Sequence, residues 1–207
     1  MKILSARMGP IETNCYVLID GATGKAAVID PAAPGPELRQ MLALPEISSV
    51  EYIILTHRHY DHVLGAASLQ KETGAEVLIG ENDAAALTDP AVSLAAVHGY
   101  SQEPVEPSRL LREGDHISLG MLDIAVLHTP GHTAGGISLV TEDVIFSGDT
   151  LFAGSMGRTD LPSGSEEEIF RSLRKLSELP GDYRVLPGHG PETRLEFERR
   201  SNPFMRG

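Results

Sequence analysis

The chain has 207 residues, of which 41% are hydrophobic and 22% are charged, a composition typical of soluble globular proteins. This length can bury a core without disulfide support, so we expect one domain over residues 1–207. The formal net charge of −12 argues against nucleic acid and anionic membrane surfaces as partners, because both are negatively charged and would repel the protein. The single cysteine, Cys15, excludes an internal disulfide framework. No segment resembles a signal peptide or a membrane span, so we expect a cytoplasmic protein.

The first part of the chain predicts strands separated by short helices. One helix is expected at residues 36–44, which begin with a proline in a first-turn position. Residues 62–73 also have helical character and stop at Gly74, a residue suited to the left-handed end of a helix. Apolar alternation and continuous apolar runs predict strands at residues 3–8, 14–19, 25–29 and 50–55.

The second part of the chain predicts more strands and the clearest helix, in the segment SGSEEEIFRSLRKLSELPG. Ser165 and Glu168 are spaced as a capping box, and Ile169, Leu173 and Leu176 form one apolar stripe. Further strands are expected at residues 76–79, 116–119, 122–128, 136–140, 144–147 and 183–186. This order of elements predicts an α+β fold in which two sheets pack face to face with helices outside.

The segment ILTHRHYDHVLG concentrates residues that bind metals directly after a predicted strand. Three later turns, HTPGHTAGG, FSGDTLFAG and LPGHGP, each add one candidate ligand: His132, Asp149 and His189. Loops at strand ends can bring side chains from distant segments to one point. The candidate ligands are His57, His59, Asp61, His62, His132, Asp149 and His189.

Imidazole and carboxylate groups suit zinc, iron or manganese, and no cysteine cluster competes with them. Seven such side chains are too many for one tetrahedral ion and fit two ions that share a ligand. We therefore expect two divalent metal ions per chain, zinc foremost, with iron or manganese as alternatives. Two such ions would bring four positive charges, of which Asp61, Asp149 and a bridging hydroxide would neutralise three. The one positive charge that remains favours a small anionic substrate.

The motifs THRHYDH, HTPGHT, SGDTLF and PGHG, in this order, resemble those of the metallo-β-lactamase superfamily over nearly the whole chain. The resemblance implies a four-layer αβ/βα sandwich of two mixed β-sheets flanked by helices. It also implies how the ligands divide: His57, His59 and His132 on the first metal, Asp61, His62 and His189 on the second, and Asp149 between them.

Two longer segments, GDTLFAGSMGRTDLPSGS and PGHGPETRLEFERRSNPFMR, are similar to the glyoxalase II group, the hydroxyacylglutathione hydrolases. The similarity is to the short members, since about eighteen residues follow His189 and the C-terminal helical region of the longer enzymes is missing. The implied reaction is hydrolysis of an S-2-hydroxyacylglutathione thioester to a 2-hydroxy acid and a thiol. The resemblance supports the thioester chemistry more strongly than the thiol carrier.

In this reaction a water between the metals would lose its proton near neutral pH and attack the carbonyl carbon. Asp61 is a candidate to orient that water in addition to binding metal. Arg158 and Asp160, in GRTD, are expected to face the cleft, where Arg158 either binds a substrate carboxylate or forms a loop salt bridge with Asp160. Tyr60 is expected to be a packing residue or part of the cleft wall, where it would contact the substrate, and not a proton donor.

Three alternatives stay open from the sequence. Persulfide dioxygenases also resemble this chain, including a GRTD segment, and would use one iron held by His57, His132 and Asp149. A lactone or a β-lactam could replace the thioester as the bond that is hydrolysed. A metal-stabilised binding protein without turnover is the third alternative, and the sequence does not indicate an oligomeric state.

Overall fold

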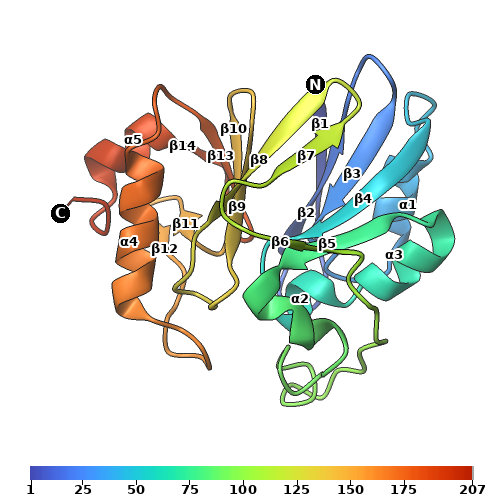
Figure 1. Cartoon of the computed structure of the whole chain (residues 1–207), viewed down its shortest axis with the longest axis horizontal. Helices are drawn as coiled ribbons and strands as arrows, with labels where there is room; N and C mark the ends of the chain where they lie inside the picture. The colour runs from blue at the N-terminus through green and yellow to red at the C-terminus, as the bar shows by residue number, and fades with distance from the viewer. Residues whose placement is uncertain (207) are drawn as a thin grey trace.

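The computed structural model describes residues 1–206, and its strands form two six-stranded sheets that pack face to face (Figure 1). The first sheet has the order β1-β2-β3-β4-β5-β6, with antiparallel pairing from β1 to β3 and parallel pairing from β3 to β6. Its strands are β1 (Lys2–Met8), β2 (Thr13–Ile19), β3 (Lys25–Ile29), β4 (Ser49–Leu55), β5 (Glu76–Gly80) and β6 (Arg109–Leu111).

The second sheet has the order β14-β13-β10-β9-β8-β7 and is also mixed, because β10 and β13 pair in parallel while the other neighbours are antiparallel. A separate two-stranded hairpin, β11 (Leu151–Phe152) with β12 (Ser155–Met156), follows β10. The strands of the second sheet are β7 (His116–Leu119), β8 (Leu122–His128), β9 (Ile137–Thr141), β10 (Val144–Gly148), β13 (Arg184–Pro187) and β14 (Thr193–Arg194).

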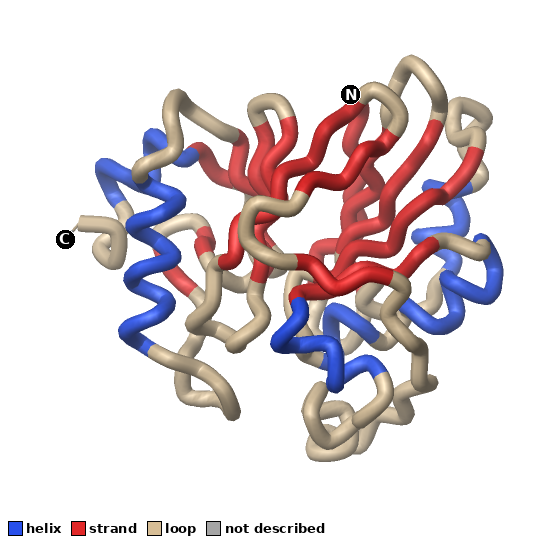
Figure 2. The backbone as a smooth tube through the Cα atoms, in the orientation of Figure 1, coloured by secondary structure: helices blue, strands red, loops and turns tan. Residues whose placement is uncertain are grey.

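Helices cover the outer faces of both sheets, so the strands occupy the middle of the molecule (Figure 2). In Figure 1, α1 and α3 lie on the outer side of the first sheet, and α4 and α5 lie on the outer side of the second. The helices are α1 (Pro36–Leu42), α2 (Tyr60–Val63), α3 (Ala66–Thr73), the 3₁₀ helix η1 (Glu81–Leu87), α4 (Glu166–Ser177) and α5 (Leu195–Ser201). The predicted four-layer sandwich with two mixed sheets is confirmed.

Strand β2 shows how the sequence builds these layers. All seven of its residues are buried, as expected for a strand covered on both faces. Cys15, Val17 and Ile19 belong to the core beneath α1 and α3, whereas Tyr16 and Leu18 belong to the core between the two sheets. This alternation follows from the two-residue repeat of a strand. A third cluster, which includes Leu173 and Leu176 of α4, fills the space outside the second sheet.

Most predicted elements are observed, with shifts of one or two residues at their ends. The predicted helix at residues 36–44 ends at Leu42. The predicted helix at residues 62–73 is two helices, α2 and α3, separated near Gly65. A Cβ atom on Gly65 would lie 2.3 Å from the carbonyl oxygen of Pro31, so this close approach of two backbones requires glycine. Gly74 ends α3 with φ +73°, as the sequence predicted.

Helix α4 begins as predicted, because the Ser165 hydroxyl accepts a hydrogen bond from the Glu168 N–H at 3.3 Å. The Glu168 carboxylate accepts from Arg171 instead of completing a capping box.

The sequence analysis missed six short elements: η1, β6, β11, β12, β14 and α5. Strands of two or three residues are too short to show alternation, which explains most of these omissions.

Helix α5 anchors the β11–β12 hairpin through two polar side chains. The carboxylate of Glu198, which is fully buried, accepts from the Gly154 N–H at 2.8 Å. The side-chain amide of Asn202 donates to the Ser155 carbonyl at 3.0 Å and to Glu198 at 2.8 Å. The end of the chain therefore holds the hairpin in place.

Among residues 1–206, no helix combines the length and the apolar character that crossing a bilayer requires.

Candidate metal centre

The seven candidate ligands come from loops that follow strands of both sheets. His57 and His59 directly follow β4, and the short helix α2 carries Asp61 and His62. The other three residues follow three different strands of the second sheet: His132 after β8, Asp149 after β10 and His189 after β13. The centre therefore lies where the ends of the two sheets meet.

All seven side chains meet in one cluster. The geometry contains three groups whose ligand atoms lie within 4.8 Å of one another. Two of these groups, His57–His59–His132 and Asp61–His62–His189, agree with the two ligand sets that the family resemblance implies. The third group consists of His57, His62 and Asp149.

Asp149 lies between the two expected ligand sets. Its Oδ1 is 3.5 Å from His62 Nε2, and its Oδ2 is 3.5 Å from His132 Nε2 and 3.6 Å from His189 Nε2. One carboxylate thus reaches side chains of both sets. This placement agrees with a shared ligand.

Several polar atoms of the cluster fit a bound cation because they have no other partner. The buried atoms His57 Nε2, His62 Nε2 and Asp149 Oδ1 make no hydrogen bond. The facing nitrogens His59 Nδ1 and His132 Nε2 are only 2.8 Å apart. A buried polar atom without a partner costs about 1–3 kcal/mol. Several such atoms at one point are therefore better explained by a cation that they would share than by packing alone.

Neighbouring oxygen atoms fix the imidazole rings in these orientations. Asp30, which is buried, accepts from Thr56 N and Thr56 Oγ1 at 2.8 and 2.7 Å and lies 2.9 Å from His62 Nδ1. The Arg158 carbonyl oxygen lies 2.7 Å from His132 Nδ1. In each ring the other nitrogen, Nε2, faces the cluster, which is the usual arrangement around a metal.

Asp83 is not a candidate ligand, but it connects the segment that carries His57 and His59 to the loop that carries His132. Its fully buried carboxylate accepts from Arg58 N at 3.1 Å, Thr133 Oγ1 at 2.6 Å and Gly135 N at 3.0 Å. Arg58 lies between His57 and His59, and Thr133 follows His132. Burial raises the pKa of Asp83, while the hydrogen bond from Thr133 lowers it.

The sequence analysis did not single out Asp30 or Asp83. Asp30 directly follows the apolar strand β3, just as Asp149 directly follows β10, and that position was an available signal. Asp83 lies in a short 3₁₀ helix with the sequence ENDAAAL, where nothing local distinguishes it from a surface aspartate.

Two glycines let the backbone approach the cluster. A Cβ atom on Gly188 would lie 2.2 Å from Asp149 Oδ1 and 2.6 Å from His62 Cε1. A Cβ atom on Gly157 would lie 1.8 Å from the Asp149 carbonyl oxygen. These positions exclude any larger side chain unless the ligands move.

The electrostatics of the cluster favour neutral imidazoles at His57 and His59 and a cation at His62. Burial, together with neighbouring imidazoles, lowers the pKa of His59 to about 3 and that of His57 well below its ordinary value. Burial also acts on His62, but Asp61, Asp30 and Asp149 outweigh it and raise the pKa of His62 well above its ordinary value. Carboxylates that favour a protonated imidazole would equally favour a metal cation at that place.

Asp61 is held as a carboxylate. Burial raises its pKa, but His62 and the hydrogen bond from His189 outweigh burial and hold the pKa below its usual range. Its Oδ2 accepts from Thr13 Oγ1 at 2.9 Å and lies 3.1 Å from His189 Nε2.

A cavity of about 570 Å³ opens onto the cluster. Tyr60 and Arg158 are among the residues that line it, and Asp160 is not. The Arg158 Nε and Nη2 donate to the two carboxylate oxygens of Asp160 at 2.7 and 2.6 Å. Arg158 was expected either to bind a substrate carboxylate or to form a salt bridge within its loop, and the structure shows the salt bridge.

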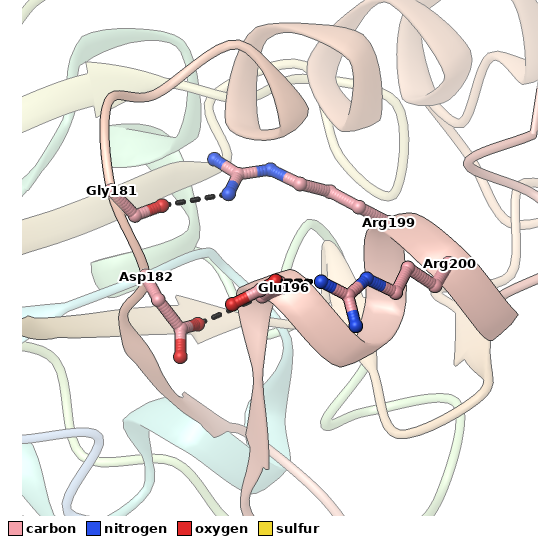
Figure 3. A pocket seen from close by; sticks show the side chains of 5 residues that line it. All are labelled: Gly181, Asp182, Glu196, Arg199 and Arg200. Atoms are coloured by element: carbon pink, nitrogen blue, oxygen red, sulfur yellow. Dashed lines mark hydrogen bonds and ion pairs between the residues drawn. The ribbon is translucent and has the colours of Figure 1, made fainter.

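A second hollow, of about 460 Å³, lies beside α5 and carries no comparable chemistry (Figure 3). Arg199 donates to the carbonyl oxygens of Ser177 and Gly181 at 2.8 and 2.7 Å and also to that of Leu179. It therefore caps the carboxyl end of α4. Arg200 pairs with Glu196, so both guanidinium groups at this hollow have internal partners.

The remaining histidines of the chain lie outside the cluster. His116 pairs with Asp123 on the exposed face of the β7–β8 hairpin, His128 Nε2 is 3.0 Å from the Ala134 carbonyl oxygen, and His98 stacks on Tyr60.

Comparison with known proteins identifies the family. The model of the metallo-beta-lactamase superfamily matches residues 8–189. The hydroxyacylglutathione hydrolase GloC of Haemophilus influenzae is 34% identical over 94% of this chain and 93% of its own length. Among solved structures, the BLEG-1 B3 metallo-beta-lactamase is 32% identical with a TM-score of 0.92 and full coverage of both chains. The di-iron-bound form of TTHA1623 is 35% identical with a TM-score of 0.86, covering 97% of this chain and 99% of that one. From its family match and from a fold that brings seven histidine and aspartate side chains to one point, this chain belongs to the metallo-beta-lactamase superfamily.

Proposed function

We propose that the chain is a metal-dependent hydrolase that cleaves thioesters, with the glyoxalase II reaction on 2-hydroxyacylglutathione as its prototype. The observation that carries this proposal is the convergence of seven ligand-type side chains, several of which have buried polar atoms without another partner. The similarity to GloC supports the thioester as the bond that is cleaved.

Two divalent cations fit the donor set, and the TTHA1623 structure, in a di-iron-bound form, supports two sites. His57, His59 and His132 would hold one cation, Asp61, His62 and His189 would hold the other, and Asp149 would contact both. Zinc, iron and manganese all accept these ligands. When bound, such cations lower the pKa of coordinated water and polarise a carbonyl group.

The protein side chains supply position and charge for this reaction. Asp61 has one carboxylate oxygen fixed by Thr13 and His189 and can orient the attacking water through its charge. The reaction adds water across the acyl–sulfur bond, so the products are a carboxylic acid and a thiol. A thiol with a pKa of about 8.5 is a good leaving group, so the site needs no strong general acid.

Two other reactions suit the same residues. The similarity to BLEG-1 supports hydrolysis of a β-lactam, for which the attacking water and the ligands would be the same. Oxidation of a persulfide at a single iron would use His57, His132 and Asp149 and would consume oxygen.

Elemental analysis combined with three assays separates these functions. We expect two metal equivalents per chain and turnover of S-lactoylglutathione by metal-replete protein. The same preparation is tested with glutathione persulfide in an oxygen electrode and with a chromogenic cephalosporin. One iron per chain with oxygen consumption and no thioester cleavage would replace the proposal with the dioxygenase.

Two matched variants test the site itself. His132→Ala removes a candidate ligand and should lower both the metal content and thioester turnover. His116→Gln changes an exposed histidine that pairs with Asp123 and should change neither. Equal activity of the two variants would contradict the proposed centre.

A further inference from the structure

The walls of the cavity above the candidate metal centre are mainly apolar. Fourteen residues line it, and five of them belong to the centre. Of the other nine, six are aliphatic, aromatic or thioether side chains: Ile11, Tyr60, Leu94, Phe152, Met156 and Leu161. The volume of about 570 Å³ lies within the range of about 300–1,000 Å³ that is typical for small-molecule pockets.

One wall is fixed by the irregular segment before β6. Tyr60 and Leu94 are both 8% exposed, and Leu161 packs against them. The Tyr60 ring stacks on the rings of His98 and Tyr100, with centroids 4.9 and 5.1 Å apart. This wall is therefore formed before a ligand binds, so little order has to be gained on binding.

The opposite end of the apolar lining belongs to the β11–β12 hairpin. The Phe152 ring lies 6.4 Å from the His189 ring, so its apolar surface begins next to the centre. Met156 lines the same cavity. Glu198 and Asn202 hold this hairpin against α5.

Outside the candidate metal centre, the lining of the cavity offers little positive charge to an anionic carrier. Arg158 is the only lysine or arginine among the described lining residues. Its Nε and Nη2 donate to Asp160 in a bidentate pair, so an internal carboxylate already matches its charge. A substrate carboxylate would compete with Asp160 for the charge of Arg158, whereas an apolar group meets no such competitor.

From these walls and this charge balance, we propose that the cavity selects thioesters whose non-reacting part is uncharged and apolar. The inference rests on the proposed thioester hydrolysis and narrows its substrate class. It places an apolar thiol carrier ahead of a tripeptide carrier such as glutathione, which bears two carboxylates.

A series of acetyl thioesters tests this preference. The acetyl esters of ethanethiol, butanethiol and hexanethiol differ only in apolar length, and the acetyl ester of 3-mercaptopropionate places a carboxylate where butanethiol has its terminal ethyl group. We expect kcat/KM to rise about two- to fourfold per added methylene, since a fully buried methylene contributes about fourfold. The butanethiol ester should exceed the carboxylate-bearing ester at least tenfold.

Three variants connect the preference to named residues. Phe152→Ala should reduce the gain per methylene, whereas Phe170→Ala, which removes a 40% exposed phenylalanine of α4, should leave it unchanged. Asp160→Asn removes the charge partner of Arg158. The ratio of kcat/KM for the butanethiol ester to kcat/KM for the carboxylate-bearing ester should therefore fall at least threefold. No gain with chain length, or a preference of the unmodified protein for the carboxylate, would overturn the inference.

Binding without turnover separates this inference from the proposed function. In matched ketones, a methylene group is inserted between the carbonyl and the sulfur, so they cannot be hydrolysed as thioesters. Calorimetry on metal-replete protein should show the affinity of these ketones rising with chain length by similar factors. Binding that rises with length while no thioester is cleaved would refute the thioesterase and support the apolar cavity. Binding that is independent of length would refute the apolar cavity whatever the turnover.

Discussion

The two halves of the chain contribute to the candidate metal centre in different ways. The first half supplies His57, His59, Asp61 and His62 from one continuous segment, and each of these residues is at most 4% exposed. The second half supplies three single residues from three loops, and the side chain of His189 is 25% exposed. The continuous segment is therefore fixed by local structure, whereas the three separate loops depend on contacts that cross the molecule.

The second half should accordingly be the easier part to disrupt without unfolding the protein. Its ligands rely on close backbone approaches at Gly188 and Gly157, on the Arg158 carbonyl and on the link through Asp83. The first half relies on Asp30 and on the buried end of β4. The predictions below test this difference.

The largest effect is expected from Gly188→Ala. The added Cβ atom would lie 2.2 Å from Asp149 Oδ1, so the carboxylate that reaches both ligand sets must move. We expect at least a hundredfold loss of hydrolysis and the loss of at least one metal equivalent, with an unchanged circular dichroism spectrum.

Gly190→Ala is the matched control. Gly190 has φ +76°, but nothing lies within 4 Å of its added Cβ atom. The substitution should cost only about 1–2 kcal/mol of backbone strain and keep the metals. Similar metal loss in both variants would show that strain, and not the clash with Asp149, disturbs the centre.

The next largest effect is expected from Asp30→Asn in the first half. The substitution exchanges a carboxylate for an amide beside His62 Nδ1 and Thr56. Loss of such a supporting carboxylate commonly lowers metal affinity about 10- to 100-fold. Competition with a chelator measures the affinity, and Asp123→Asn, at an exposed pair, provides the control. Unchanged affinity would mean that the backbone alone orients His62.

Asp83→Asn should have a smaller effect that is shared between stability and metal binding. At least one of its three donors, Arg58 N, Thr133 Oγ1 or Gly135 N, would lose a charged acceptor. We expect the free energy of unfolding, measured in urea, to fall by about 1–3 kcal/mol. The ligand set that contains His132 should lose metal before the set that contains His189. If the free energy of unfolding falls while metal binding is unchanged, Asp83 stabilises the fold but does not position the metal ligands.

The smallest effect is expected at Cys15. Its thiol is fully buried, and burial raises its pKa above the ordinary value. The native protein should therefore react with a chromogenic disulfide at a negligible rate and consume one equivalent only when unfolded. Rapid reaction of the native protein would show that the β2 core opens readily.

The difference between the halves also explains what the sequence could predict. The spacing of His57, His59, Asp61 and His62 is visible in six consecutive residues, and the two-residue repeat of strands such as β8 predicted their bounds without error. Asp149 and His189 could be grouped with them only because their motifs occur in a known order. The roles of Asp30 and Asp83 could not be predicted, since each depends on a contact between segments at least 25 residues apart in the chain.

The small elements around the cavity were also beyond the sequence. The β11–β12 hairpin has two residues in each strand, and its position depends on Glu198 and Asn202, more than 40 residues later. The break near Gly65 depends on a close approach to Pro31, which no helical pattern in residues 62–73 could indicate.

The link between α5 and the hairpin has a consequence for how such a protein can diversify. A substitution near Glu198 can tilt Phe152 and reshape the cavity while every histidine and aspartate of the centre stays in place. Selectivity can therefore drift through mutations on a peripheral helix, and a library for directed evolution could begin at residues 195–202 instead of at the motifs.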